Sequence, residues 1–258
     1  MEFSQLLDKL NALYDFPLGL KSTYKLTDFK VTYGELFQEH LGDYDFWGYC
    51  DIDLTFGDIR KFITDEILDK FDKILTRGHF TLFRNDEKIN TFYRKSIAGV
   101  EPYREVFSNP QHFYFDEWGK NGINQIFSTY NVEMYDEIMF HNVYQRKYHF
   151  YPTQLMHLNE YKSRNIYLWE GGSLFRYYLD KKNNLLKEEI MYVHFLRRKM
   201  DAIYDPHKAN RVLMVPNRYE SVGNDWTESD IANYLKRKSF DLDHINFYIK
   251  QFKRKYKL

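Results

Sequence analysis

Cysteine is almost absent from this sequence, because Cys50 is the only thiol among 258 residues. One cysteine excludes a disulfide framework within the chain and favours a reducing compartment. No stretch approaches 18 consecutive apolar residues, so we expect no membrane-spanning helix. Residues 1–4 carry neither the basic flank nor the apolar stretch of a secretory signal. Together these absences predict a cytoplasmic protein.

An excess of charge of either sign is also missing. Lys and Arg number 37, and so do Asp and Glu, which gives a formal net charge of zero. A neutral chain has no overall field that attracts nucleic acid, and we predict no nucleic-acid partner. Aromatic residues, in contrast, make up 19% of the chain. This share is explained either by an A·T-rich genome or by rings that stack on sugars and bases in half-wet clefts.

The spacing of apolar residues predicts an α/β chain. Helices are predicted at residues 3–14, 29–41, 59–71, 86–94, from residue 227, and 243–256. Strands are predicted at residues 44–50, 73–75, 79–83, 166–169, 174–178 and 189–196, whereas residues 100–130 are rich in loop residues. We see no repeat and no linker, and therefore predict one domain over residues 1–258: a mixed sheet flanked by helices over 1–217 and a helical segment over 218–258.

Two aspartates, Asp51 and Asp53, follow the apolar and aromatic run at residues 44–50, which is typical of a central strand. Residues two apart on a strand share a face, so both carboxylates are expected at one point, at the end of the strand where α/β sheets bind ligands. Carboxylates that close repel each other unless a cation lies beside them. Mg²⁺ or Mn²⁺ accepts such ligands together with phosphate oxygens. The pattern predicts a metal site for a diphosphate; a plain acidic pair in a loop is the alternative.

The residues around this pair resemble a family of bacterial glycosyltransferase-like proteins found with capsular and other surface-polysaccharide genes. More distantly, they resemble enzymes with a glycosyltransferase A-type fold and a D-x-D motif. The most specific part is FWGYCDIDLTFGDI at residues 46–59. The resemblance extends over roughly residues 20–200, through the segments YKLTDFK at 24–30, YG at 33–34, GHFTLFRN at 78–85, FDEW at 115–118, VHF at 193–195 and RRKM at 197–200.

This resemblance implies a metal-dependent, hexosyltransferase-like enzyme. It would move a sugar from a nucleotide diphosphate sugar to a glycan or lipid-linked glycan acceptor in surface-polysaccharide synthesis. Mn²⁺ or Mg²⁺ would be the cofactor, bound by Asp51 and Asp53, with Asp51 also facing the ribose or sugar of the donor. His194 matches the histidine that often completes the metal shell, and His79 is a weaker candidate; a hydrogen-bonded core histidine is the alternative for His194.

Asp28 and Lys30 match two further positions of the A-type pattern. Asp28 would reach hydroxyls of the donor sugar, although capping of the following helix is an equal alternative for it. Lys30 would take the place of a basic partner of the donor. Because that residue is a lysine and not an arginine, a bidentate contact with phosphate is not expected.

Asp116 and Glu117 are the candidate catalytic carboxylates, and they lie between Phe115 and Trp118. An inverting transferase needs a carboxylate that takes the proton of the acceptor hydroxyl. Partial burial beside aromatic rings would raise the pKa of such a group usefully. Trp118 could stack on an acceptor sugar. A helix cap or an ion pair is the alternative for either carboxylate.

The two ends of the chain add two further expectations. Only 50 residues precede Asp51, and the first 23 resemble one helix and a loop, so the nucleotide-binding part of the A-type fold is shortened. A degenerate relative that binds a glycan or a partner is therefore kept as an alternative, as is a phosphoesterase with two metals. A basic C-terminus suits either a solvated helix face or peripheral contact with the inner face of the membrane; it contains Lys250, Lys253, Arg254, Lys255 and Lys257.

Overall fold

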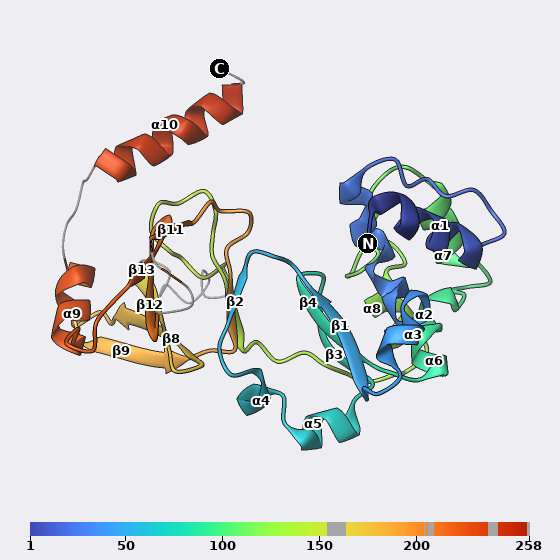
Figure 1. The fold of residues 1–258 in the computed structure, drawn as a ribbon, viewed down its shortest axis with the longest axis horizontal. Coiled ribbons are helices and arrows are strands. Elements are labelled where there is room, and N and C mark those ends of the chain that lie inside the picture. The colour runs from blue at the N-terminus through green and yellow to red at the C-terminus, as the bar shows by residue number, and fades with distance from the viewer. Residues whose placement is uncertain (154–163, 204, 206–208, 237–241, 257–258) are drawn as a thin grey trace. The chain divides into compact units, whose positions relative to one another are not determined.

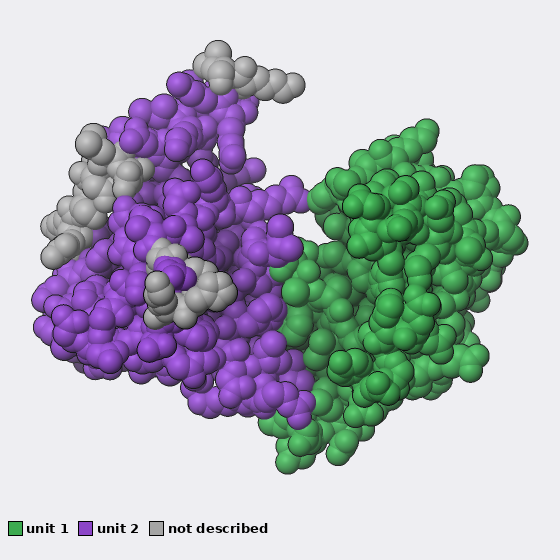
Figure 2. Space-filling view, in the orientation of Figure 1, with its two compact units in different colours: residues 1–51, 64–137 green, residues 52–63, 138–258 purple. Residues whose placement is uncertain are grey.

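The computed structural model describes residues 1–153, 164–203, 205, 209–236 and 242–256. The chain divides into two compact units (Figure 2), which are unit 1, Met1–Asp51 with Thr64–Glu137, and unit 2, Ile52–Ile63 with Ile138–Leu258. Both units combine helices with β-strands, and the sheets are mixed, so the predicted α/β class is confirmed. The prediction of one domain divided at residue 217 stays a prediction.

Unit 1 is a four-stranded sheet with short helices, most of which lie on one side of it (Figure 1). Its strands follow the order β1-β4-β3-β5, and all pairs are antiparallel except β3 with β5. The elements are α1 (Phe3–Leu13), the 3-10 helix η1 (Thr23–Thr32), α2 (Tyr33–Leu36), α3 (Gln38–Leu41), β1 (Phe46–Cys50), α5 (Asp65–Lys70), β3 (Lys73–Arg77), β4 (Phe80–Arg84), α6 (Glu87–Asn90), η2 (Phe92–Arg94), α7 (Pro102–Ser108), α8 (Ile123–Thr129) and β5 (Met134–Tyr135).

The core of unit 1 is aromatic, and it forms where β1 and β4 face the helices. Trp47 of β1 pairs with Phe83 of β4, and their rings stack at 4.8 Å between centroids. Phe107 of α7 stacks on Phe29 at 4.3 Å, and both side chains are fully buried. Such stacked and tilted pairs contribute beyond the area they bury, by about 0.5–1.5 kcal/mol each. Many of the aromatic residues of the sequence lie in this core.

Several predictions about unit 1 need correction. Among the described residues, β4 is the only strand that pairs with β1, so β1 is an edge strand and not a central one. Asp51 and Asp53 do not project from one strand, since β1 ends at Cys50 and β2 begins at Leu54. The helix predicted at residues 29–41 is three short helical segments, and the one at 59–71 is interrupted before α5. The region predicted to be loop-rich contains α7 and α8.

The described part of unit 2 contains two sheets. The smaller has the order β2-β10-β6 and the larger the order β11-β13-β12-β7-β8-β9. The elements are β2 (Leu54–Phe56), α4 (Ile59–Phe62), β6 (Phe140–Asn142), β7 (Asn165–Glu170), β8 (Ser173–Leu179), β9 (Leu185–Glu189), β10 (Tyr192–His194), β11 (Asp201–Ile203), β12 (Arg211–Val215), β13 (Arg218–Ser221), α9 (Glu228–Lys236) and α10 (Leu242–Tyr256). The strands predicted at residues 166–169 and 174–178 are β7 and β8, which pair as an antiparallel hairpin. The strand predicted at residues 189–196 is the end of β9 followed by β10.

Alternation along β7 distributes its side chains over two cores. Ile166 and Leu168 pack with Ile231 of α9 on one face of the larger sheet. Tyr167 faces the other way and packs with Val193 of β10. Period-two alternation of this kind is what a strand covered on both faces requires. None of the helices in the described ranges has both the length and the apolar character needed to cross a bilayer.

Candidate functional site

His194 ends β10, which is the middle strand of the smaller sheet in unit 2. In the ladders it pairs with Leu54 of β2 on one side and with Asn142 of β6 on the other. The imidazole Nδ1 lies 2.9 Å from Asn142 Oδ1, and the residue is only 5% exposed. The hydrogen bond to Asn142 fixes the orientation of the ring, which is the usual requirement for a histidine that acts as a ligand.

Asp53 directly precedes Leu54, which pairs with His194 in the β2–β10 ladder. This pairing places Asp53 beside His194. Its Oδ1 lies 3.2 Å from His194 Nε2, and its Oδ2 accepts a hydrogen bond from the backbone N–H of Arg197. Burial opposes ionisation, but the hydrogen bonds from His194 and Arg197 outweigh it and lower the pKa of Asp53 to about 2. The carboxylate is therefore ionised at neutral pH.

The turn after β10 has a strained backbone. Leu196 and Arg197 are two successive residues with positive φ, at 50° and 62°. Side chains other than glycine rarely adopt this conformation, which costs roughly 1–2 kcal/mol per residue. In this turn the backbone N–H of Arg197 donates to Asp53 Oδ2. The strained backbone therefore supplies a hydrogen bond that positions the Asp53 carboxylate. Strained backbone of this kind is concentrated at functional sites.

The chemistry of the Asp53–His194 pair fits a divalent cation. His194 Nε2 and Asp53 Oδ1 face each other. When the neutral imidazole carries its proton on Nδ1, which then donates to Asn142 Oδ1, both facing atoms carry lone pairs. Either a proton or a cation between the two atoms removes this repulsion. An imidazole nitrogen with a carboxylate oxygen suits Mn²⁺, and Mg²⁺ suits the carboxylate. Asn142 then supports the ring as an outer partner. Sequence reasoning missed Asn142 because only strand pairing brings it to His194.

Asp51 is the last residue of unit 1 before the chain enters unit 2. Its backbone N–H donates to the carbonyl of His79 at 2.9 Å, which extends the β1–β4 ladder by one residue. Its side chain is 38% exposed, and Oδ1 lies 2.7 Å from Lys30 Nζ. Ile52 alone separates it from Asp53, so the two Cα atoms are at most about 7 Å apart.

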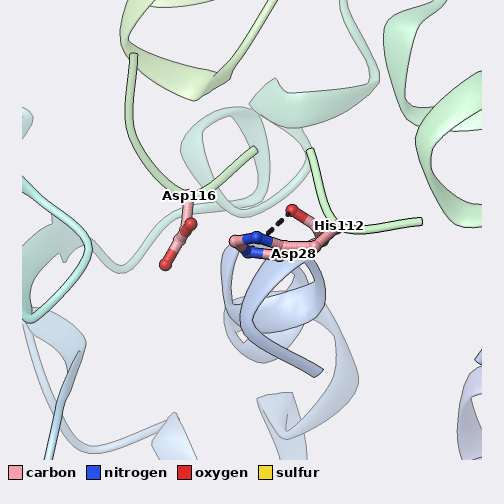
Figure 3. Close-up of side chains that lie close together, drawn as sticks. All are labelled: Asp28, His112 and Asp116. Atoms are coloured by element: carbon pink, nitrogen blue, oxygen red, sulfur yellow. Dashed lines mark ion pairs between the residues drawn. The ribbon is translucent and has the colours of Figure 1, made fainter. Parts of the chain in front are cut away.

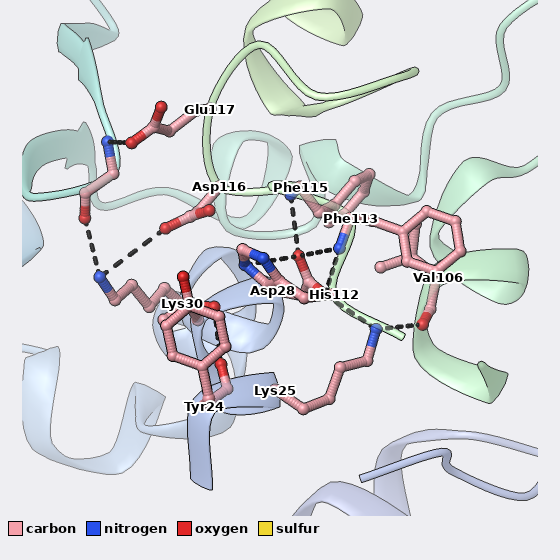
Figure 4. A network of polar contacts seen from close by, with 12 residues as sticks. Tyr24, Lys25, Asp28, Lys30, Val106, His112, Phe113, Phe115, Asp116 and Glu117 are labelled. Carbon is pink, nitrogen blue, oxygen red and sulfur yellow. Dashed lines mark hydrogen bonds and ion pairs between the residues drawn. The ribbon is translucent and has the colours of Figure 1, made fainter. Parts of the chain in front are cut away.

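Lys30 contacts three acceptors within unit 1, and Figure 4 shows its contact with Asp116. Besides Asp51, its ammonium donates to the carbonyl of Gly78 at 2.8 Å and lies 3.7 Å from Asp116 Oδ2. It also lies over the ring of Tyr49, 5.2 Å from the centroid. The position of the ammonium is thus fixed by a hydrogen bond and a ring contact as well as by ion pairs. Lys30 and Asp116, predicted separately from the sequence, meet here.

Asp116 is a buried carboxyl group with an unusual titration. Burial raises its pKa, the charges of Glu117 and Asp28 raise it further, and Lys30 lowers it, which leaves a pKa of about 7. A group that is half protonated at neutral pH can both accept and donate a proton efficiently. The pKa is raised in the direction expected for a buried carboxyl group, whereas the catalytic role of Asp116 stays a prediction.

Glu117 points to the other side of the same loop. Its Oε1 accepts from the backbone N–H of Gly78 at 2.9 Å, which ties the loop to the turn between β3 and β4. A Cβ at position 78 would come within 2.6 Å of both Asp116 Oδ2 and Glu117 Oε1. An added Cβ would therefore force one of these carboxylate side chains to shift. In the sequence, the signal for this close approach is the glycine directly before His79.

Asp28 is fully buried and organises the loop that carries Asp116. Its carboxylate accepts from the backbone N–H groups of Phe113 and Phe115 at 3.0 and 2.9 Å, and from Lys25 Nζ at 2.8 Å. The His112 ring lies 3.6 Å from it (Figure 3). Sequence analysis missed Lys25, although three-residue spacing in a helical turn is a signal for an ion pair. With these donors, Asp28 contacts a loop and not a solvent-exposed ligand.

The predicted residues thus form two groups, one in each unit. Asp53 and His194 meet in unit 2, although 140 positions separate them in the sequence. In unit 1, Lys30 contacts both Asp51 and Asp116, while Asp28 and Glu117 support the loop around Asp116. The side chain of His79 is buried, and it is the backbone of this residue that contacts Asp51. The roles of these residues as metal ligands or donor contacts stay predictions.

Comparison with known proteins gives a family for the chain. Residues 1–222 match the model of a family of unknown function, DUF6625. The chain belongs to DUF6625. The match includes every residue of both groups. Neither the curated proteins nor the solved structures contain a match to this DUF6625 member.

Proposed function

We propose that this DUF6625 protein is a metal-dependent glycosyltransferase of the A-type, which moves a sugar from a nucleotide diphosphate sugar to a glycan in bacterial surface-polysaccharide synthesis. The observation that carries the proposal is the Asp53–His194 pair, with 3.2 Å between carboxylate and imidazole. Two residues far apart in sequence meet as a ligand set for Mn²⁺ or Mg²⁺. The D-x-D resemblance around Asp51 and Asp53 supports the same chemistry.

The roles follow from the charges of these groups. Asp53 and His194 would bind the cation, with Asp51 as the neighbouring carboxylate. When bound, the cation neutralises the charge of the departing diphosphate. Asp116 takes the proton of the acceptor hydroxyl, since its pKa of about 7 makes it a competent base near neutral pH. The charge of Lys30 lowers the pKa of Asp116 and so keeps part of its population ionised near neutral pH.

Metal binding by the full chain tests the first step. We expect Mn²⁺ to raise the melting temperature of the wild type, because a ligand at 100 times its Kd stabilises the folded state by about 2.7 kcal/mol. Asp53→Asn and His194→Gln should each weaken Mn²⁺ binding at least about tenfold in titration calorimetry. Asp201→Asn is the matched control, an exposed aspartate of unit 2. Equal Mn²⁺ affinity in all four proteins would remove this site.

A donor screen tests the second step. With Mn²⁺ present, a panel of UDP-, GDP- and dTDP-sugars should include one that shifts the melting temperature further and is hydrolysed slowly to the nucleoside diphosphate. Asp53→Asn should abolish this hydrolysis. A shift that persists in Asp53→Asn would exclude Asp53 from donor binding.

One observation favours the alternative of a degenerate, glycan- or partner-binding relative. The Asp51 carboxylate is engaged by Lys30 at 2.7 Å, a strong charge-assisted contact that a cation would have to replace. A protein that binds a glycan but neither Mn²⁺ nor any nucleotide sugar would support this alternative.

The C-terminal helix α10 supports a proposal about location. Exposed apolar side chains at Ile245, Ile249 and Phe252 follow a helical spacing, and basic residues accompany them. Lys257 of the predicted basic run lies outside the described residues. We propose that α10 lies on anionic lipid, where a lipid-linked acceptor would be found. Phosphatidylserine vesicles should float the full chain but not a chain without its last nine residues; equal flotation would contradict this.

A further inference from the structure

A cluster of three rings lies on the surface of unit 1 beside Asp116. The His112 ring contacts Tyr24 at 4.7 Å and Tyr114 at 4.2 Å between centroids. Tyr24 and Tyr114 are 46% and 57% exposed. A ring nitrogen of His112 lies within 4.8 Å of a carboxylate oxygen of Asp116, and Figure 3 shows the two side chains side by side. This aromatic cluster (Tyr24, His112 and Tyr114) therefore offers ring faces to solvent next to a carboxylate.

The backbone of Tyr114 is held in an unusual conformation. Its φ is +56°, in the left-handed region that bulky residues rarely adopt. Exposed aromatic side chains gain nothing from such strain in terms of core packing. Strained residues persist where the surrounding structure imposes them, and they concentrate at ligand-binding sites.

A buried network imposes this conformation (Figure 4). Asp28 accepts from the N–H groups of Phe113 and Phe115, which are the two neighbours of Tyr114. Lys25 holds the Asp28 carboxylate, and the two side chains are 1% and 0% exposed. Burying an ion pair is unfavourable unless both partners are well satisfied. The result of this arrangement is a rigid loop that displays Tyr114 on the surface and places Asp116 below it.

We propose that the aromatic cluster is a carbohydrate-binding platform. The C–H face of a sugar ring stacks on exposed aromatic rings, which Tyr24 and Tyr114 provide. The charges favour a neutral ligand, because Asp116 and Glu117 are acidic and Lys30 is already paired with Asp51. A phosphate-rich ligand would be repelled at this surface. The identification of this carbohydrate as the acceptor rests on the proposed function; the binding itself does not.

Saturation-transfer NMR on the full chain tests the platform. The probes are maltoheptaose, cellohexaose and chitohexaose, with uridine as a nucleobase control, in EDTA so that no metal contributes. Irradiation of the aromatic protons should transfer saturation to at least one oligosaccharide. Tyr114→Ala and Tyr24→Ala should each weaken binding by about threefold to tenfold, the range typical of losing one aromatic contact. Tyr44→Ala is the matched control, since Tyr44 is an exposed tyrosine before β1, at the other end of that strand from Asp51.

A second substitution separates ring loss from loop distortion. Tyr114→Gly removes the ring and also relieves the strain, because glycine adopts positive φ freely. It should bind as weakly as Tyr114→Ala while unfolding at a higher temperature. Absence of transfer to all three oligosaccharides, transfer to uridine alone, or unchanged transfer in the Tyr114 variants would overturn the proposal. Oligosaccharide binding without any Mn²⁺-dependent donor hydrolysis would retain the platform and remove the transferase.

Discussion

Lys30 and Asp51 form an ion pair, with 2.7 Å between Nζ and Oδ1, and the same ammonium lies 3.7 Å from Asp116. The Lys30 ammonium thus contacts two carboxylates for which the sequence analysis predicted different roles. Lys30 opposes the other influences on Asp116, because its charge lowers the pKa that burial, Glu117 and Asp28 raise. The protonation of the candidate base therefore depends on whether this lysine is engaged elsewhere.

Removing the lysine should change the titration of Asp116. In Lys30→Met the favourable charge is lost, so the pKa of Asp116 should rise above its value of about 7 in the wild type. Carbon-detected NMR of the aspartate carboxyl groups would follow the titration directly. Lys21→Met, at an exposed lysine of the same unit, should leave it unchanged. A lower pKa in Lys30→Met would contradict the described contact.

The stability of the protein should also depend on pH through Asp116. Its pKa is about 7 in the folded state against 3.8 for an ordinary aspartate, so between these values the folded state binds the proton more tightly. The contribution to stability is therefore complete below pH 4 and is lost as the pH rises to 7. The rise of the pKa from 3.8 to about 7 sets an upper limit of roughly 4 kcal/mol on this contribution.

Asp116→Asn isolates this effect. Because asparagine does not titrate, the variant should gain stability relative to the wild type as the pH rises from 5 to 8 in urea unfolding. Asp43→Asn, at an exposed aspartate of unit 1, should show no such trend. A constant difference between Asp116→Asn and the wild type across this range would mean that Asp116 titrates normally.

Gly78 and Gly42 form a matched pair for substitution by alanine. At Gly78 a Cβ would lie 2.6 Å from Asp116 Oδ2, whereas at Gly42 nothing lies within 4 Å. We expect Gly78→Ala to destabilise the protein by about 1–3 kcal/mol, as overpacked sites do. Gly42→Ala should be neutral or stabilise by about 0.4–1 kcal/mol, because it restricts the unfolded chain. Urea unfolding of both variants compares them, and equal effects would place Asp116 away from the turn.

Sequence patterns sufficed where local spacing decides structure. The leucines of α1 and the two strands around Gly171 and Gly172 are examples, since the helix needs one apolar stripe and both glycines have positive φ. Sequence patterns gave the wrong secondary structure where one residue type occurs both in loops and in helices. Pro102 suggested a loop, yet it occupies the first turn of α7, where proline is well tolerated.

The sequence predicted which residues belong to the candidate site better than it predicted which of them contact one another. The sequence selected Asp53 and His194 together only through the resemblance, because no spacing rule links residues so far apart. It placed β1 in the centre of a sheet from its apolar content. The alternation of buried Trp47 and Tyr49 with exposed Gly48 and Cys50 is instead the pattern of a strand covered on one face. The partners Asn142, His112 and Lys25 depend on tertiary pairing, and composition does not identify them.

The buried pair Lys25–Asp28 should contribute far more than an exposed one. Lys25→Met leaves the Asp28 carboxylate without its cation in a site that is 0% exposed, so unfolding free energy should fall by about 3–5 kcal/mol. Lys9→Met breaks the Lys9–Glu39 pair, whose carboxylate is exposed to solvent, and should change stability little. Urea unfolding with intact protein measures both. Because the same network fixes Tyr114, amide exchange in the loop at residues 113–115 should accelerate in Lys25→Met and not in Lys9→Met; similar exchange in both variants would show that the loop holds its conformation without the ion pair.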